Sequence, residues 1–166
     1  MMLKSLLILC AFLTATPGFG ATRTAVRVSP ANLQGLRPLQ VQTEKAAIRD
    51  YLQSWQSFRA AFEQNRADLL DSDFVGTAKD KLTQTIQQQA ALGIRTQYRD
   101  QVHDIQIVFY SPEGLSIELI DNVSYSVQIF DHGKVKTIQN VSARYLIVLT
   151  PAEVRWRVRV FQAEPQ

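Results

Sequence analysis

The sequence predicts an α+β fold in which N-terminal helices pack on a curved, antiparallel, four-stranded sheet. The spacing of apolar residues changes at Gly93 from about 3.6 residues to 2, which indicates helices before this glycine and strands after it. Connections of hairpin length separate the strands, so each strand is expected to pair antiparallel with the next. The chain has 166 residues, of which 46% are apolar and 20% charged, as is typical of one globular domain. This order of elements excludes a doubly wound parallel sheet.

The first twenty residues are predicted to be a secretory signal peptide. Lys4 gives the segment a positive start, residues 5–15 are apolar, and small residues precede a cleavage site after Gly20. The apolar stretch is shorter than the about 20 residues of a membrane-spanning helix, and it contains the only cysteine, Cys10. We therefore expect a secreted or periplasmic protein, without disulfides and without a stable membrane span after signal cleavage. The alternative is that the segment stays uncleaved as an anchor.

The helical part of the domain is expected to begin at Thr43. Residues 21–42 contain three arginines, two prolines and no sustained period, and they are predicted to form an extended linker before a domain of residues 43–166. Apolar side chains then recur every three or four residues in a first helix: Ile48, Tyr51, Leu52, Trp55, Phe58 and Phe62. A short turn over residues 67–70 and a second helix over residues 77–92 follow, with Gly93 in the position after a helix C-terminus.

Four strands are expected after Gly93, over residues 98–110, 115–129, 134–149 and 155–162. Apolar and polar residues alternate along them, as in the run from Leu115 to Ile129. The segments Ser-Pro-Glu-Gly, Asp-His-Gly and Thr-Pro-Ala-Glu supply the turns between them.

Several segments of this pattern carry a resemblance to a known family. They are the aromatic helix AIRDYLQSWQSF, the hairpin YSVQIFDHG, the strand ARYLIVL and the closing strand RWRVRVF, within residues 43–162. The pattern resembles the nuclear transport factor 2-like superfamily, in which a long curved sheet wraps helices into a cone. Within it, the chain is most similar to the intermembrane-space domain of a plastid-division protein and to similar bacterial domains. The resemblance implies either an isomerase, dehydratase or cyclase or a non-catalytic binding domain, and the fold does not choose between them.

One carboxylate is a candidate acid or base inside the cone. Asp121 lies between Leu119 and Val123, on the apolar side of its strand, and a carboxylate in an apolar cavity suits general acid–base catalysis. Tyr98 and Tyr125 are the candidates that would donate hydrogen bonds to a substrate. The alternatives are a β-bulge that turns Asp121 outward and tyrosines that serve only as core residues.

The sequence predicts neither a catalytic pair nor a metal site that includes the histidines. Regular alternation places Asp100 and His103 on opposite faces of their strand, Asp104 is no better placed, and His132 lies in a turn. Two histidines and no cysteine in the mature chain provide too few ligands for zinc or iron. Phosphate-binding and dinucleotide-binding glycine motifs are missing from the sequence as well. We therefore expect neither a metal nor a cofactor.

A row of arginines on the last strand is the candidate partner-binding surface. Arg155, Arg157 and Arg159 share one face of that strand, and Arg144 extends the row on the neighbouring strand. Such a row suits an acidic partner, whereas the alternative is a solvated face that prevents sheet aggregation. The overall charge of +3 comes from interspersed signs, so no nucleic acid is expected as a partner.

The sequence favours a non-catalytic binding or protein-interaction module over an enzyme, because no set of catalytic residues converges in the pattern. Its partner would be a protein or a small apolar ligand in the cone. The alternative is a small-molecule isomerase, dehydratase or cyclase that uses Asp121 with Tyr98 or Tyr125. A cavity of roughly 300 Å³ or more that contains Asp121 would favour the enzyme. The resemblance also implies homodimers through the outer sheet face, while the arginines there favour a monomer or a polar interface.

Overall fold

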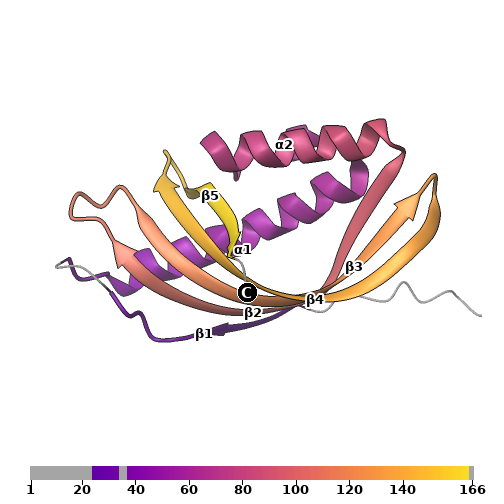
Figure 1. The fold of residues 1–166 in the computed structure, drawn as a ribbon. Coiled ribbons are helices and arrows are strands. Elements are labelled where there is room, and N and C mark those ends of the chain that lie inside the picture. Colours follow the sequence, from indigo (N-terminus) through magenta and orange to yellow (C-terminus); the bar gives the residue numbers. More distant parts are fainter. Residues whose placement is uncertain (1–23, 34–36, 165–166) are drawn as a thin grey trace, which may run out of the picture.

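The computed structural model describes residues 24–33 and 37–164, so the predicted signal peptide lies outside the described residues. Two helices and a short 3₁₀ helix lie over the concave side of one strongly curved sheet (Figure 1). The helices are α1 (Val41–Gln64), the 3₁₀ helix (Ala67–Leu70) and α2 (Gly76–Ala91). The strands are β1 (Thr24–Val28), β2 (Ile94–Tyr110), β3 (Ile117–Asp131), β4 (Lys134–Pro151) and β5 (Trp156–Glu164). The predicted α+β class is confirmed.

The helices end where the sequence provides residues that tolerate left-handed backbone. α1 stops at Asn65, whose φ is 54° and whose N–H donates to the carbonyl of Ala61. α2 stops before Gly93, whose φ is +68°. A Cβ at Gly93 would lie 2.8 Å from Nε2 of His132, but that side chain is exposed and can move, so it is the backbone conformation that requires glycine there. The predicted end of the second helix at this glycine is therefore correct.

The three long hairpins form as the turn signals predict, because β2–β3, β3–β4 and β4–β5 all pair antiparallel. The pairing of β2 with β3 shifts register between Arg99 and Val102 and again between Ile107 and Phe109. Asp100, inside the first of these bulges, has a φ of 52°. Bulges bend a strand and change which side chains face inward, and the first one determines the composition of the site described below.

The prediction of an extended linker over residues 21–42 is wrong for residues 24–28, and the sheet has five strands rather than four. β1 runs parallel to β2, with Thr24 opposite Gln101 and Val28 opposite Ile105. Its partner lies 77 residues away and no hairpin turn joins the two, so local sequence patterns do not reveal the pairing. Helix α1 also begins at Val41, two residues before the predicted start.

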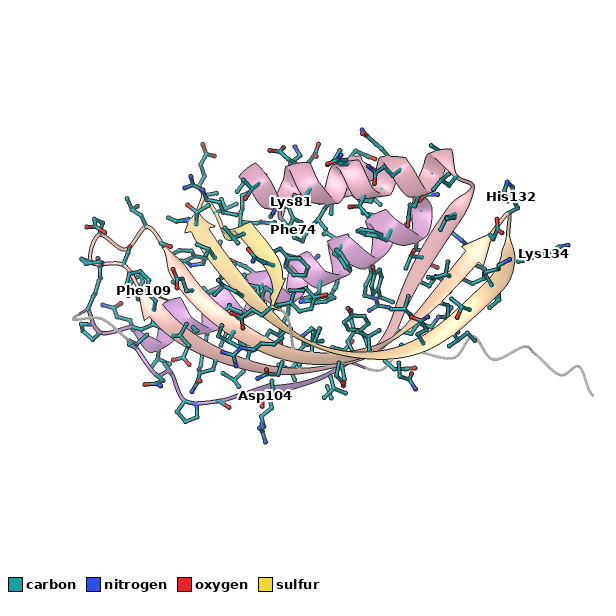
Figure 2. The ribbon with its side chains drawn as sticks, in the orientation of Figure 1. Phe74, Lys81, Asp104, Phe109, His132 and Lys134 are labelled. Carbon is teal, nitrogen blue, oxygen red and sulfur yellow. The ribbon has the colours of Figure 1, made fainter. Side chains whose placement is uncertain are left out.

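β1 is held to the sheet by side chains on the convex face as well as by its backbone. Arg27 donates to Asp104 with an N–O distance of 2.6 Å, and Ser29 donates to the same carboxylate. Figure 2 shows Asp104 on the side of the sheet away from the helices. The Arg27 hydrogen bond lowers the pKa of Asp104, so the pair keeps its charges at neutral pH and is lost only in acid.

We expect Arg27→Ala to loosen β1 while leaving the rest of the sheet intact. The strand would lose its ion pair but keep its backbone pairing with β2, so local opening of this edge becomes easier. Hydrogen exchange followed by mass spectrometry should show several-fold faster exchange at residues 24–28 and unchanged exchange in β3 and β4. Lys134→Ala, at the tip of the distant hairpin, is the matched control. Equal exchange at residues 24–28 in the parent and in Arg27→Ala would contradict the prediction.

The space between helices and sheet is filled by aromatic side chains around Trp55. Its ring centroid lies 5.1 Å from that of Phe58, 5.4 Å from that of Phe161 and 5.8 Å from that of Tyr145. Phe161 reaches this cluster because the β4–β5 register shifts between Val148 and Leu149.

No helix in the described part of the chain is long and apolar enough to cross a membrane.

Candidate functional site

A buried polar network links α1 to β2 and β3 beneath the aromatic cluster. Asp121 is fully buried, and its Oδ2 lies 2.7 Å from the hydroxyl of Tyr51 and 2.7 Å from Nδ1 of His103. The indole N–H of Trp55 donates to the same Tyr51 hydroxyl at 2.8 Å. Asp121 therefore points inward, as the alternation of β3 predicts, and the bulge that would have turned it outward does not occur at this point of the strand.

The directions of these hydrogen bonds follow from the chemistry of the partners. Burial and the nearby charge of Asp121 raise the pKa of Tyr51 well above its usual value. The phenol therefore stays protonated and donates a hydrogen bond to the carboxylate. Because the carboxylate oxygen of Asp121 is the acceptor, Nδ1 of His103 is the donor of the second hydrogen bond. The other ring nitrogen, Nε2, is buried and has no hydrogen-bond partner among the described residues.

The predicted catalytic trio does not assemble around Asp121. The hydroxyl that bonds Asp121 belongs to Tyr51 on α1, not to Tyr98 or Tyr125. Tyr125 instead lies 3.0 Å, oxygen to oxygen, from Tyr145. Burial raises the pKa of both Tyr98 and Tyr145, so these phenols stay neutral. Tyr98 packs its ring against Phe58 in the aromatic cluster.

His103 is the site residue that the sequence pattern misses. Regular alternation places Tyr98 and His103 on opposite faces, whereas the bulge between Arg99 and Val102 brings both onto the concave face. The same bulge buries Gln101, whose side-chain nitrogen Nε2 also lacks a partner in the described part of the structure. A β-bulge of this kind leaves no reliable signal in the sequence, so the inward orientation of His103 could not be predicted from alternation.

Two adjoining hollows form a groove between α1 and β1. The polar hollow has a volume of about 440 Å³, and its lining includes Gln101, His103, Trp55 and Arg59. The apolar hollow has a volume of about 710 Å³, and its lining includes Val28, Val41, Ile48 and Leu52. Leu52 and Gln56 line both hollows, so the two adjoin, and we call them together the α1–β1 groove. Asp121 lies behind His103 and lines neither hollow.

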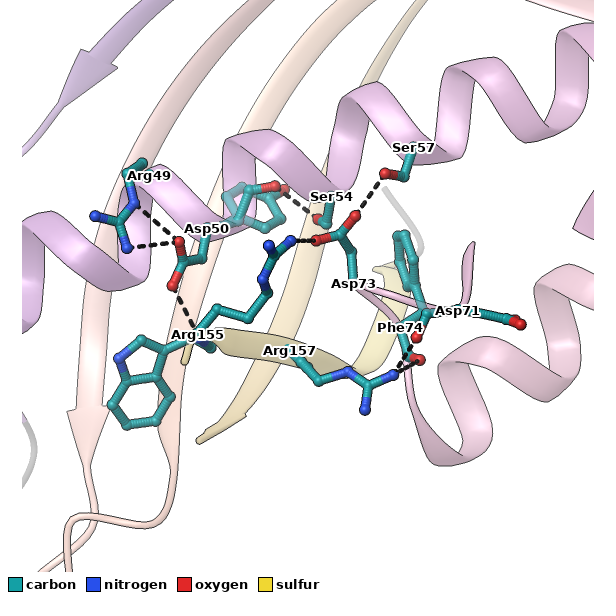
Figure 3. Close-up of polar contacts among 11 residues, drawn as sticks. Arg49, Asp50, Ser54, Ser57, Asp71, Asp73, Phe74, Arg155 and Arg157 are labelled. Carbon is teal, nitrogen blue, oxygen red and sulfur yellow. Dashed lines mark hydrogen bonds and ion pairs between the residues drawn. The ribbon is translucent and has the colours of Figure 1, made fainter. Parts of the chain in front are cut away.

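The predicted partner-binding arginines are largely engaged within the chain. Arg144 pairs with Glu164, and Arg155 pairs with Asp73 at 3.0 Å. Arg157 donates to the backbone carbonyls of Asp71 and Phe74, which fastens the loop before α2 to β5 (Figure 3). Arg159 is exposed. These contacts give three of the four arginines a structural role, and their use in partner binding stays a prediction.

We expect Arg155→Ala to lower the free energy of unfolding by about 1–3 kcal/mol, because among the described side chains it leaves the almost fully buried carboxylate of Asp73 with Ser57 alone as a hydrogen-bond donor. Arg159→Ala, on the same strand but exposed, should change it by less than about 0.5 kcal/mol. Urea unfolding followed by circular dichroism measures both values. Equal effects of the two substitutions would show that the Arg155–Asp73 pair contributes nothing to stability.

Comparison with known proteins identifies the fold. No family model and no curated protein sequence matches the chain. Among solved structures, it is similar to the intermembrane space region of the chloroplast protein ARC6, with a TM-score of 0.61, 12% identity, and coverage of 78% of this chain and 100% of that one. It is also similar to a scytalone dehydratase-like protein from Novosphingobium aromaticivorans, with a TM-score of 0.53, 12% identity, and coverage of 76% and 89%. Both have nuclear transport factor 2-like folds, which confirms the predicted fold and resemblance.

Proposed function

We propose that this nuclear transport factor 2-like chain is a non-catalytic binding module that acts outside the cytoplasm and holds an amphipathic small molecule in the α1–β1 groove. One observation carries the proposal. The residues that line the polar hollow include Gln101 and His103, whose buried Nε2 atoms have no hydrogen-bond partner among the described residues, and an apolar hollow adjoins it. Buried polar atoms without partners are rare in folded proteins, and a ligand with a polar end and an apolar body would complete this site.

The packing around Asp121 supports binding rather than catalysis. The carboxylate is fully buried beneath Tyr51 and His103, and aromatic rings fill the space around Trp55. A substrate in the groove would meet His103 rather than Asp121. The extracytoplasmic location is supported by the apolar segment before Gly20 and by the likeness to an intermembrane space region.

Binding can be followed by the fluorescence of Trp55, which lines the polar hollow. Trp156→Phe leaves Trp55 as the only tryptophan of the chain. Dodecanoate and dodecanol serve as amphipathic probes, and at least one should give a saturable change at a 1:1 ratio. Leu52→Arg, in both hollows, and Val28→Arg, on the exposed strand, should each weaken binding at least tenfold, whereas Val135→Arg, on the remote β4, should not. Failure of both probes to saturate would overturn the proposal.

A small-molecule enzyme of the dehydratase or isomerase type is the second candidate. The observation that favours it is the short contact between His103 and Asp121, which leaves Nε2 of His103 as an acid or base next to the groove. Turnover of a groove ligand that is abolished by Asp121→Asn, with binding retained, would replace the binding proposal by this one. Binding of the same ligand without turnover would leave the binding proposal standing.

A further inference from the structure

We infer that the ligand of the α1–β1 groove is an amphipathic monocarboxylate, with its carboxylate between Arg59 and Gln101 and its apolar chain along Leu52 and Ile48 toward Val28. The inference rests on the proposed function and names the chemical class of the ligand. Arg59 and Gln101 both line the polar hollow, one from α1 and the other from β2. Leu52, Ile48 and Val28 line the apolar hollow that adjoins it.

Gln101 and Arg59, two side chains that line the polar hollow, are hydrogen-bond donors and therefore match a ligand whose head group is an acceptor. The amide nitrogen of Gln101 is buried and has no partner in the part of the chain that the structure describes, and it can only donate. The guanidinium of Arg59 is likewise donor-only, and a carboxylate accepts from such a fork with two oxygens. An alkyl alcohol offers one oxygen to these donors, and an alkylammonium ion offers none. A carboxylate is therefore the simple organic head group that best matches the two side chains.

Arg59 is placed to bind an anion from the groove. Its Nε donates to the backbone carbonyl of Tyr98 at 3.0 Å, which fixes the side chain against β2. No ion pair within the described residues includes Arg59. Burial lowers the pKa of Arg59, and the charges of Glu63 and Asp100 offset this only in part, so an anion in the groove would stabilise the guanidinium further.

Glu63 is the one acidic residue in the lining of the polar hollow, and it limits the site to a single negative charge. It stands one helical turn after Arg59, and its Oε1 accepts a hydrogen bond from Gln97 at 2.7 Å. A divalent head group such as a phosphate monoester would meet one arginine and one opposing carboxylate. A monocarboxylate balances the charge of Arg59, and its single charge is repelled less by Glu63 than the two charges of a phosphate monoester would be.

The apolar hollow matches the other end of such a ligand. Its volume of about 710 Å³ falls within the range of sites for small organic molecules. Its charged residues are Glu44, Lys45 and Arg49, all from the first half of α1. Each methylene group that the hollow buries should raise affinity about threefold to fourfold.

Isothermal titration calorimetry on the full chain tests the inference with three probes of equal length: dodecanoate, dodecanol and dodecylammonium. Dodecanoate should bind at least tenfold more tightly than dodecanol, and dodecylammonium should not bind. Arg59→Gln and Gln101→Leu should each reduce the affinity for dodecanoate to near that for dodecanol, and should weaken dodecanol binding much less. Arg66→Gln, an exposed arginine just beyond α1 that pairs with Asp68, is the matched control and should change neither.

Glu63→Gln provides a test with the opposite sign. The amide oxygen can still accept the hydrogen bond from Gln97, so the fold should be retained, and removal of the negative charge should raise dodecanoate affinity about twofold to fivefold. If dodecanol binds as tightly as dodecanoate and Arg59→Gln and Glu63→Gln have no effect, the carboxylate inference is wrong while the groove proposal stands. If dodecanoate and dodecanol both fail to bind, the proposed function fails with it.

Discussion

Asp121→Ala should lower the free energy of unfolding by about 2–6 kcal/mol, among the largest effects expected of a single substitution in this chain. The carboxylate accepts hydrogen bonds from Tyr51 and His103 in a region that water does not reach. Alanine would leave both donors buried without an acceptor, and each such donor costs about 1–3 kcal/mol. Urea unfolding followed by circular dichroism measures the difference.

Two further variants separate the hydrogen bonds from other consequences of the substitution. Asn122→Ala changes the next residue of β3, which is exposed, and should cost less than about 0.5 kcal/mol. Tyr51→Phe keeps the ring but removes the hydroxyl that joins Trp55 to Asp121, so it should cost about 1–3 kcal/mol. An Asp121→Ala protein as stable as its parent would show that the network does not contribute to folding stability.

The helices and the hairpins could be predicted because their signals are local. The stripe of apolar residues in α1 and the glycine after α2 each depend on residues within a few positions of one another. Most strand ends differ from their predicted positions by two residues or fewer, but β2 begins at Ile94 rather than at Tyr98. The inward orientation of Asp121 was also predictable, since the pairing of β3 is regular around it.

The partners of Asp121 could not be predicted, because each depends on a distant or irregular feature. His103 faces inward only because a bulge at Arg99–Val102 shifts the alternation of β2. Tyr51 reaches the carboxylate from a helix 70 residues earlier. The groove depends on β1, whose parallel pairing crosses almost half of the chain. Bulges and long-range pairing leave weak traces in one sequence.

The arginines of the last strand show a second limit of sequence patterns, because their partners come from a loop that is distant in the sequence. Alternation in the sequence predicts that Arg155 and Arg157 lie on the face opposite Trp156 and Val158, but it gives no sign that the loop before α2 lies against them. Asp73 and the carbonyls of Asp71 and Phe74 come from that loop (Figure 3). A pattern of charge along one strand therefore predicts which face the residues occupy, not whether the chain itself supplies their partners.

Trp55→Ala is the second substitution with a large expected effect, about 3–5 kcal/mol of lost stability. The indole is almost fully buried, its ring meets those of Phe58, Tyr145 and Phe161, and its N–H donates to Tyr51. Trp156→Ala is the matched control, because its side chain is partly exposed and its contact with Asp50 uses the backbone N–H. It should cost clearly less in the same urea titration.

The Trp55→Ala substitution also tests whether the indole of Trp55 alone prevents the interior of this fold from holding a ligand. Removal of the indole would join the polar hollow to the space among Phe58, Tyr145 and Phe161, and an apolar cavity of this kind stays open when the surrounding side chains cannot move into it. Added indole should then bind and raise the melting temperature of Trp55→Ala, but not of the parent or of Trp156→Ala, because a ligand that binds only the folded state stabilises it. Rescue by indole would show that one side chain separates a packed interior from one that can enclose a ligand beside Asp121. Without rescue, the aromatic cluster must have collapsed into the vacated space, and the α1–β1 groove would remain the place where this chain can hold a small molecule.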